Sequence, residues 1–195
     1  MTIFHLLRHG EHRLQGKICA GRAPGISLSD KGQAEAEAAA GRLAEAKIVA
    51  IYASPMERAQ ETAAIVGERL GIPVATHHDL NELDFGEWTG LTFDEVRKDE
   101  RWPVWAQHRS LSCIPGGETM REVQRRMVEI LVELRQRYPD EAVVLASHGD
   151  PIRAALTFCL GMPLDFFARI EVGTGSLSTV RIDGRGICVT AINRS

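Results

Sequence analysis

The sequence has few cysteines, and none of the four in its 195 residues forms a C-x-x-C pair. Disulfide scaffolds are short and dense in cysteine, so this sparse set predicts reduced thiols. The apolar start, Met1–Leu7, is too short for a membrane span and lacks the basic region of a signal peptide. We therefore expect a cytoplasmic protein.

The sequence also lacks an excess of basic charge. Its formal net charge is −3 at pH 7, so no overall positive field favours nucleic acid or an anionic membrane as a partner. Repeats, low-complexity stretches and polar linkers are absent as well. The composition, with 44% hydrophobic and 25% charged residues, is that of an ordinary globular protein. The length fits a single domain over residues 1–195.

Several common catalytic motifs are missing, among them the Walker motif, H-E-x-x-H and G-x-S-x-G. Gly173-Thr174-Gly175 resembles the start of a dinucleotide loop but lacks the third glycine and the strand–helix context. His5 and His9 would lie about 13 Å apart on a strand, at ~3.3 Å per residue, which is too far to share a metal ion. These patterns give no metal site and no cofactor.

The sequence does contain an alternation of short apolar runs with helical patterns. The predicted strands of the main part of the chain are Ile3–Leu7, Ile48–Ala53, Val74–Thr76 and Ala142–Ala146. The predicted helices run from Ser29-Asp30 to about Ala46, from Ser54-Pro55 to Gly71, over Val123–Tyr138, and from Asp150-Pro151 to Gly161. Such alternation predicts an α/β fold with a mostly parallel sheet.

Local signals refine this prediction. Ser54 is the predicted N-cap of its helix, with Pro55 as the first helical residue. Capping-box spacing occurs at Thr92/Glu95 and at Thr119/Glu122. In the tail, Leu177–Ile182 and Ile187–Ile192 flank a Gly-rich turn and predict a hairpin. The expected fold is a three-layer sandwich with helices on both faces of the sheet and an antiparallel C-terminal hairpin at its edge.

Reactive side chains follow every predicted strand of the parallel part. They are Arg8 and His9, Ser54 and Arg58, His77, His78 and Glu82, and His148, Gly149 and Asp150. Ligands of open α/β sheets bind beyond the carboxyl ends of the strands, so these residues are expected to gather at one edge. Arginines match phosphate oxygens, histidine can be a covalent nucleophile, and a carboxyl group can protonate a leaving alkoxide. The set predicts a phosphate-ester site without deciding which histidine attacks.

Six motifs, in this order, resemble those of the histidine phosphatase superfamily, the phosphoglycerate mutase-like proteins. They are Leu7–Glu11 with its R-H-G triplet, Gly21-Arg22 with Leu28–Gly32, Ala53–Ala63, Asn81–Gly90, Gly116–Thr119 and Ser147–Gly149. The R-H-G triplet alone is a weak signal. Its position after the first strand and the order of the other motifs make the joint match specific, and the matches span most of the chain.

The resemblance implies a metal-independent reaction in which His9 attacks phosphorus and becomes phosphohistidine. Arg8, Arg58 and His148 would bind the non-bridging oxygens. Glu82 would protonate the leaving oxygen and later activate water; Asp84 and Glu87 are competing candidates for this acid. The expected substrate-binding residues are Gln15, Gly21, Arg22 and Gly149. Two departures concern substrate contacts: Gln15 stands where the family more often has asparagine, and Pro24-Gly25 interrupts the usual acidic residue.

The implied function is a phosphatase acting on small phosphomonoesters. A cofactor-dependent phosphoglycerate mutase is an alternative, but mutases of this family carry a longer insertion than the interval Phe85–Gly116 found here. An α-ribazole phosphatase of cobalamin synthesis and a phosphate-binding regulator without catalysis also remain open. The irregular stretch Arg97–Pro115 is a candidate cover for the site. Trp88, Trp102 and Trp105 fit the lining of a pocket and the packing of a core or lid equally well. A homodimer through an edge strand is the one further partner that we consider.

Overall fold

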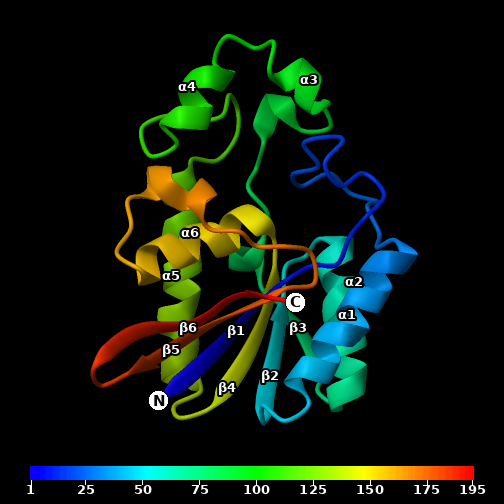
Figure 1. Cartoon of the computed structure of the whole chain (residues 1–195), viewed down its shortest axis with the longest axis vertical. Helices are drawn as coiled ribbons and strands as arrows, with labels where there is room; N and C mark the ends of the chain where they lie inside the picture. The colour runs from blue at the N-terminus through cyan, green and yellow to red at the C-terminus, as the bar shows by residue number, and fades with distance from the viewer.

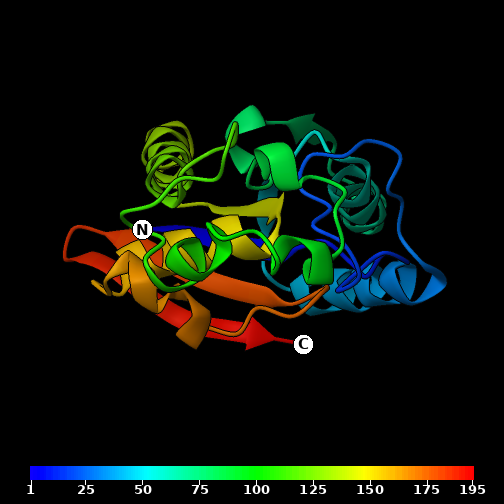
Figure 2. The same cartoon turned by 90° about the horizontal axis from the view of Figure 1, so that it is seen from above.

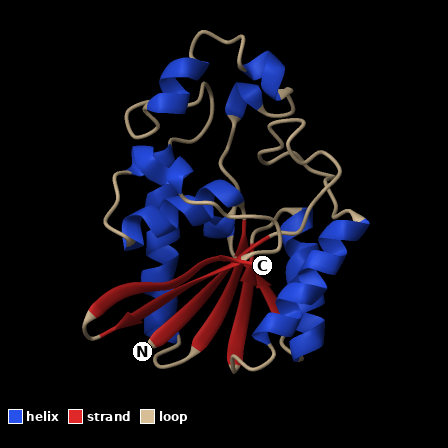
Figure 3. Cartoon of the chain, in the orientation of Figure 1, coloured by secondary structure: helices blue, strands red, loops and turns tan.

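The structure is a computed structural model that describes all residues, 1–195. Six strands form one sheet in the order β3-β2-β4-β1-β5-β6 (Figures 1 and 3). Their bounds are β1 Thr2–Arg8, β2 Ile48–Ala53, β3 Val74–Thr76, β4 Ala142–Ser147, β5 Leu177–Asp183 and β6 Gly186–Arg194. The first four strands are parallel to one another, whereas β5 runs antiparallel to β1 and β6 antiparallel to β5. The predicted strands and the antiparallel edge are confirmed.

The main helices are α1 Asp30–Leu43, α2 Glu57–Leu70, α5 Met120–Arg137 and α6 Gly149–Cys159. Between β3 and α5 lie two short α-helices, α3 Phe93–Val96 and α4 Trp102–Gln107. Three 3-10 turns complete the set: η1 His78–Leu80, η2 Gly86–Trp88 and η3 Leu164–Arg169. None of the helices has the length and apolar character needed to cross a membrane.

Apolar side chains bind a pair of helices to each face of the sheet. On one face, Phe4 and Leu6 of β1 pack in a cluster with residues of α5 and α6. On the other face, Leu7 packs in a cluster with residues of α1 and α2. Because side chains alternate along a strand, β1 serves both cores, and burying each such side chain stabilises the fold by about 1.5–3 kcal/mol. The expected three-layer sandwich is confirmed.

The start of α2 differs from its prediction. The helix begins at Glu57 with Met56 as the N-cap, and Met56 makes no side-chain capping bond. Ser54 is therefore not the N-cap. Its hydroxyl lies 2.8 Å from the Nε2 atom of His148 and 3.3 Å from the amide nitrogen of Met56. The hydroxyl accepts from the Met56 amide in the turn before the helix and also bonds His148 across two strand ends, while the helix itself begins two residues later than predicted.

The segment between β3 and α5 that contains α3 and α4 lies beyond the carboxyl ends of the parallel strands, and we call it the cover. In Figure 1 the green segment with α3 and α4 stands beyond these ends, and the view from above in Figure 2 places it in front of the sheet edge. A third apolar cluster joins the cover to the rest of the fold, with Trp88 and Trp105 packed together with Met120 of α5 and Phe167 of η3. The capping boxes at Thr92 and Thr119, both present as predicted, begin α3 and α5 at either end of it.

Candidate active site

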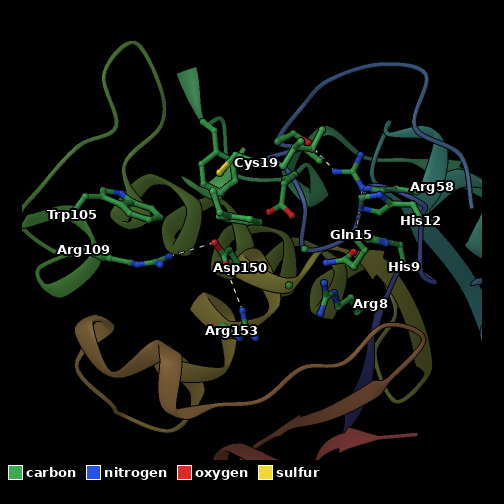
Figure 4. A pocket seen from close by; sticks show the side chains of 18 of the residues that line it. Arg8, His9, His12, Gln15, Cys19, Arg58, Trp105, Arg109, Asp150 and Arg153 are labelled. Carbon is green, nitrogen blue, oxygen red and sulfur yellow. Dashed lines mark hydrogen bonds and ion pairs between the residues drawn. The ribbon is translucent and has the colours of Figure 1, made fainter. Parts of the chain in front are cut away.

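A cavity of about 250 Å³ lies between the strand ends and the cover (Figure 4). The residues that line it come from the segment 8–21, from the start of α2, from the segment 82–109 and from the start of α6. Those that matter below are Arg8, His9, His12, Gln15, Gly21, Arg58, Glu82, Trp105, Arg109, Gly149, Asp150 and Arg153. The segments meet here because four parallel strands end at the same edge of the sheet.

His9 follows the last residue of β1 and is 2% exposed. Its Nδ1 atom lies 2.8 Å from the carbonyl oxygen of Gly10, which can only accept, so Nδ1 carries the proton. The neutral ring then has its lone pair on Nε2, which lies 3.4 Å from the Nε atom of Arg58. Burial, helped by Arg58 and Arg8, holds the pKa of His9 well below its usual value. The ring is therefore neutral and nucleophilic near pH 7.

The backbone behind His9 is tightly held. The amide of Gly10 donates to the hydroxyl of Thr62 in α2 at 3.0 Å, and that hydroxyl donates to the carbonyl of Arg58 at 2.7 Å. Gly10 also packs directly against the start of α1, where a β-carbon on Gly10 would lie 2.2 Å from the carbonyl oxygen of Gly32. Only glycine fits this contact, and it fixes the histidine relative to both helices.

Two guanidinium groups face the cavity beside His9. Arg58, in the first turn of α2, is 1% exposed and donates from Nη2 to the carbonyl of Gly21 at 2.8 Å. Arg8 donates from Nη1 to the carbonyl of Val172 at 2.6 Å. The Nη1 atom of Arg58 and the Nε atom of Arg8 are buried without a partner. Buried unpaired donors are costly, so this end of the cavity is prepared to bind an anion.

His148 completes this end of the cavity. It is fully buried, and its ring centroid lies 5.0 Å from that of His9. Its Nε2 is 2.8 Å from the hydroxyl of Ser54, while its buried Nδ1 has no hydrogen-bond partner. Burial and the charge of Arg58 hold the pKa of His148 well below its usual value. When the Ser54 hydroxyl donates to Nε2, Nδ1 carries the proton and can donate to a bound oxygen.

Glu82 is the acidic residue of the acid-loop motif that reaches the cavity. Its Oε1 accepts from the amide of Leu83 at 2.8 Å, and its Oε2 lies 3.8 Å from Nδ1 of His148. Burial first, and the charge of Asp150 second, raise the pKa of Glu82 to about 7. A carboxyl group with this pKa can give up a proton and take it back near neutral pH.

The two competing acids are engaged elsewhere. Asp84 accepts from the amide of Gly86 and pairs with Arg22, and Glu87 pairs with Arg101 on the outside of the cover. Neither lines the cavity. The structure therefore favours Glu82 among the three.

His9, Glu82 and His148 also have ligand atoms within 4.8 Å of one another, a separation that could suit a metal ion. Arg8 and Arg58 stand against the same three groups, and their charges oppose a cation. The unpaired guanidinium donors fit a phosphate better than a metal ion at this position.

The predicted substrate-binding residues divide into two groups. Gln15, Gly21 and Gly149 line the cavity, and a β-carbon at Gly149 would lie 3.4 Å from the guanidinium carbon of Arg8. Arg22 does not line it. Its guanidinium donates to the carbonyl of Glu82 at 2.9 Å and to the carboxylate of Glu118 at 2.9 Å, and so supports the segment that carries the acid.

Five further residues line the cavity. Asp150 was expected at this edge of the sheet and Trp105 was a candidate for lining a pocket, whereas sequence reasoning assigned no role to His12, Arg109 and Arg153. His12 is 4% exposed, stacks 5.6 Å from His9, and has its pKa lowered to about 4, mainly by burial. Arg153 stands three positions after Asp150, the spacing of a helical ion pair, and this was a readable signal. Arg109 lies on an irregular segment whose path no sequence pattern predicts.

Comparison with known proteins gives the family. The family model described as "Histidine phosphatase superfamily (branch 1)" matches residues 4–195. The chain belongs to the histidine phosphatase superfamily. The resemblance seen in the motifs is thereby confirmed.

Three relatives illustrate the match. The chain is 36% identical over 178 residues to the bifunctional protein Rv2228c of Mycobacterium tuberculosis, covering 89% of this chain but only 48% of that protein. It is 32% identical to the glucosyl-3-phosphoglycerate phosphatase of Mycolicibacterium vanbaalenii, over 92% of this chain and 83% of the relative. The solved structure of Bacillus stearothermophilus YhfR superposes with a TM-score of 0.94 at 28% identity, covering 100% and 98% of the two chains. The chain thus spans about half the length of the first relative and nearly all of a solved histidine phosphatase.

Proposed function

We propose that this chain is a metal-independent phosphatase that hydrolyses small phosphomonoesters through a phosphohistidine intermediate on His9. One observation carries the proposal: a buried, neutral His9 with its lone pair on Nε2 lines a cavity that also holds unpaired arginine donors and a carboxyl group whose pKa is about 7. Residues 1–195 act in this proposal as one catalytic unit. Family membership and the phosphatase named among the relatives support it.

In the first step, Nε2 of His9 attacks phosphorus and the bond from phosphorus to the ester oxygen breaks. Glu82, in its protonated form, gives its proton to that oxygen, so the leaving group departs as an alcohol. The hydrogen bond from Nδ1 to the carbonyl of Gly10 stabilises the positive ring that forms. The products of this step are the alcohol, phosphohistidine and an ionised Glu82.

In the second step, the ionised Glu82 takes a proton from a water molecule as the water oxygen attacks phosphorus. The bond from phosphorus to Nε2 breaks, inorganic phosphate leaves, and both His9 and Glu82 return to their starting states. A pKa of about 7 suits a group that must be an acid in one step and a base in the next.

The phosphoryl oxygens would bind the donors that lack partners in the structure. These are Nε of Arg8, Nη1 of Arg58 and Nδ1 of His148. They are held in place by other hydrogen bonds, to Val172, Gly21 and Ser54 respectively. Such preorganised donors stabilise charge that develops on the transferring group, typically by about 10²–10³-fold in rate for each donor.

Hydrolysis of p-nitrophenyl phosphate in excess EDTA tests the proposal. We expect steady release of p-nitrophenol by the wild type and a loss of at least about 10³-fold in His9→Ala, because covalent catalysis is removed. His78→Ala, which changes an exposed histidine outside the cavity, is the matched control and should behave as the wild type. Activity that requires an added metal ion, or that survives in His9→Ala, would contradict the proposal.

The same preparation separates a phosphatase from a mutase. With 3-phosphoglycerate and a catalytic amount of 2,3-bisphosphoglycerate, a phosphatase releases inorganic phosphate, whereas a cofactor-dependent mutase transfers a phosphoryl group from phosphohistidine to the hydroxyl oxygen at carbon 2 and forms 2-phosphoglycerate. Phosphorus NMR distinguishes the two products. Accumulation of 2-phosphoglycerate without inorganic phosphate would replace the phosphatase by a mutase while leaving the role of His9 unchanged.

A further inference from the structure

A second cluster of charged residues stands at the end of the cavity away from His9 (Figure 4). The carboxylate of Asp150 lies 3.4 Å from Nη1 of Arg109 and 3.2 Å from Nη1 of Arg153. The Arg109 guanidinium is also held between two aromatic rings, 3.8 Å from the centroid of Trp105 and 4.0 Å from that of Phe167. Contacts on several sides fix the direction of this guanidinium before any ligand arrives.

The cluster has more hydrogen-bond donors than acceptors. The Nε atom of Arg109 and the Nε1 atom of Trp105 are both buried without a hydrogen-bond partner. Trp105 is 1% exposed and the Arg109 side chain 14% exposed, so water offers these donors little compensation. The two oxygens of Asp150 are each engaged by one arginine. An acceptor supplied by a ligand would remove this deficit.

The charges that line the cavity also favour an anionic ligand at this end. Its lining holds four arginines but only two carboxyl groups, those of Glu82 and Asp150. A bound phosphate dianion offsets the arginines beside His9, and Glu82 must be neutral to act as the acid. Asp150 alone then faces the pair Arg109 and Arg153, which leaves one positive charge uncompensated. A leaving group with one negative charge would balance it.

The two ends of the cavity are close together. Gly149 lies between them: a β-carbon there would be 3.4 Å from the Arg8 guanidinium carbon and 3.7 Å from Nη1 of Arg153. A molecule whose phosphate contacts Arg8 therefore needs only a few further atoms to reach the second cluster. With a cavity of about 250 Å³, this favours a small leaving group over a long or bulky one.

We propose that Arg109 and Arg153, held in place by Asp150, form a second anion subsite, and that the substrates are small phosphomonoesters whose leaving group carries a carboxylate. The planar carboxylate matches the guanidinium fork, and its single charge matches the charge left uncompensated. This inference rests on the proposed function, since it assumes that the phosphate lies beside His9.

Binding of intact esters to His9→Ala, which cannot form the phosphoenzyme, tests the subsite apart from turnover. Calorimetry would compare 3-phospho-D-glycerate with racemic glycerol 3-phosphate, in which a hydroxymethyl group stands in place of the carboxylate. We expect at least a tenfold preference for the carboxylate. The preference should fall below about threefold when Arg109→Gln or Arg153→Gln is added, and should persist with Lys98→Gln, which removes an exposed positive charge from the same cover.

Two substitutions at the subsite protect the test against misfolding, because Arg109 is held between two aromatic rings whereas Arg153 is more exposed and lies 5.9 Å from the nearer ring centroid, that of Phe167. Thermal unfolding checks both variants. Equal affinity for the two esters, no binding of 3-phosphoglycerate, or a preference that survives in both folded variants would overturn the subsite. Turnover of p-nitrophenyl phosphate by the otherwise wild-type chain reports separately on the proposed function. Loss of the preference with turnover retained would contradict only the proposed subsite. A preference without turnover would contradict only the proposed phosphatase activity.

Discussion

The two ends of the cavity are built in different ways. At the His9 end, Arg8, His9, Arg58 and His148 stand on or next to a strand or helix terminus, and hydrogen bonds to the backbone or to Ser54 fix each one. At the Arg109 end, the groups come from the cover and from α6, and they are fixed by one carboxylate and by aromatic rings. The His9 end is therefore built at the ends of the strands and main helices, whereas the Arg109 end combines α6 with the cover.

From this difference we expect the His9 end to carry out the reaction and the Arg109 end to determine which substrates are preferred. Changes at the His9 end should impair every substrate alike, because every phosphomonoester presents the same phosphoryl group. Changes at the Arg109 end should alter the ranking of substrates, because only the leaving group reaches it. The expected effects below test that division, from the largest to the smallest.

Glu82→Gln should lower kcat/KM for an alkyl phosphate by about 10³-fold, since a poor leaving group needs the proton. With p-nitrophenyl phosphate, whose leaving group is stable as an anion, the loss should be much smaller. The kcat/KM values for both esters, measured in stopped assays, test this. Equal losses for the two esters would contradict the assignment of Glu82 as the acid.

The pH dependence gives an independent check on Glu82. Its pKa is raised to about 7, so the acid form needed in the first step is lost as the pH rises through 7, and kcat/KM for an alkyl phosphate should fall there. His9 stays neutral well below pH 6.5, so activity should persist on the acid side. In Glu82→Gln the alkaline fall near pH 7 should vanish; its persistence would assign it to another group.

Arg58→Gln should lower kcat/KM by about 10²-fold for all esters, with or without a carboxylate, because it removes a preorganised donor to the phosphoryl group. Parallel assays with 3-phosphoglycerate and glycerol 3-phosphate test this. A loss confined to one of the two would break the proposed division between the two ends.

Trp105→Phe should lower the preference for 3-phosphoglycerate over glycerol 3-phosphate by roughly threefold to tenfold, because it removes the unpartnered Nε1 donor and retains an aromatic ring under Arg109. The ratio of the two kcat/KM values is the readout. An unchanged ratio in a folded variant would show that this donor does not contact the leaving group.

Thr119→Ala should reduce stability without changing the chemistry. It removes the capping box at the start of α5, in which the hydroxyl accepts from the amide of Glu122. The expected loss is about 1 kcal/mol of unfolding free energy, measured by denaturant unfolding, with kcat/KM unchanged. A large loss of activity would mean that the base of the cover and the site are more tightly coupled than their separate contacts indicate.

Much of the His9 end of the cavity could be predicted from the sequence. The strands Ile3–Leu7, Ile48–Ala53 and Ala142–Ala146 are short and apolar, and the rule that ligands bind beyond parallel strand ends placed the residues after them at one edge. The structure brings Arg8, His9, Arg58, Glu82 and His148 together there. These predictions succeeded because they needed only strand positions and directions.

The failures share one cause. The N-cap at Ser54 was wrong because the helix begins later, with Met56 as its N-cap, and the Ser54 hydroxyl also bonds His148, a residue 94 positions away that no local pattern reveals. The subsite around Arg109 was not foreseen because it depends on the path of an irregular segment and on packing against Trp105 and Phe167. Local patterns do not reveal a contact between side chains that lie far apart in the chain.

The central claim is the covalent role of His9, and trapping the intermediate tests it most directly. The enzyme would be mixed with p-nitrophenyl phosphate, quenched in alkali during turnover, since phosphohistidine survives base but not acid, and mapped by peptide mass spectrometry. The account predicts one phosphoryl group per chain, on the peptide that holds His9 and on no other. Sustained turnover with no phosphorylated peptide, or with the phosphoryl group on a different residue, would contradict it.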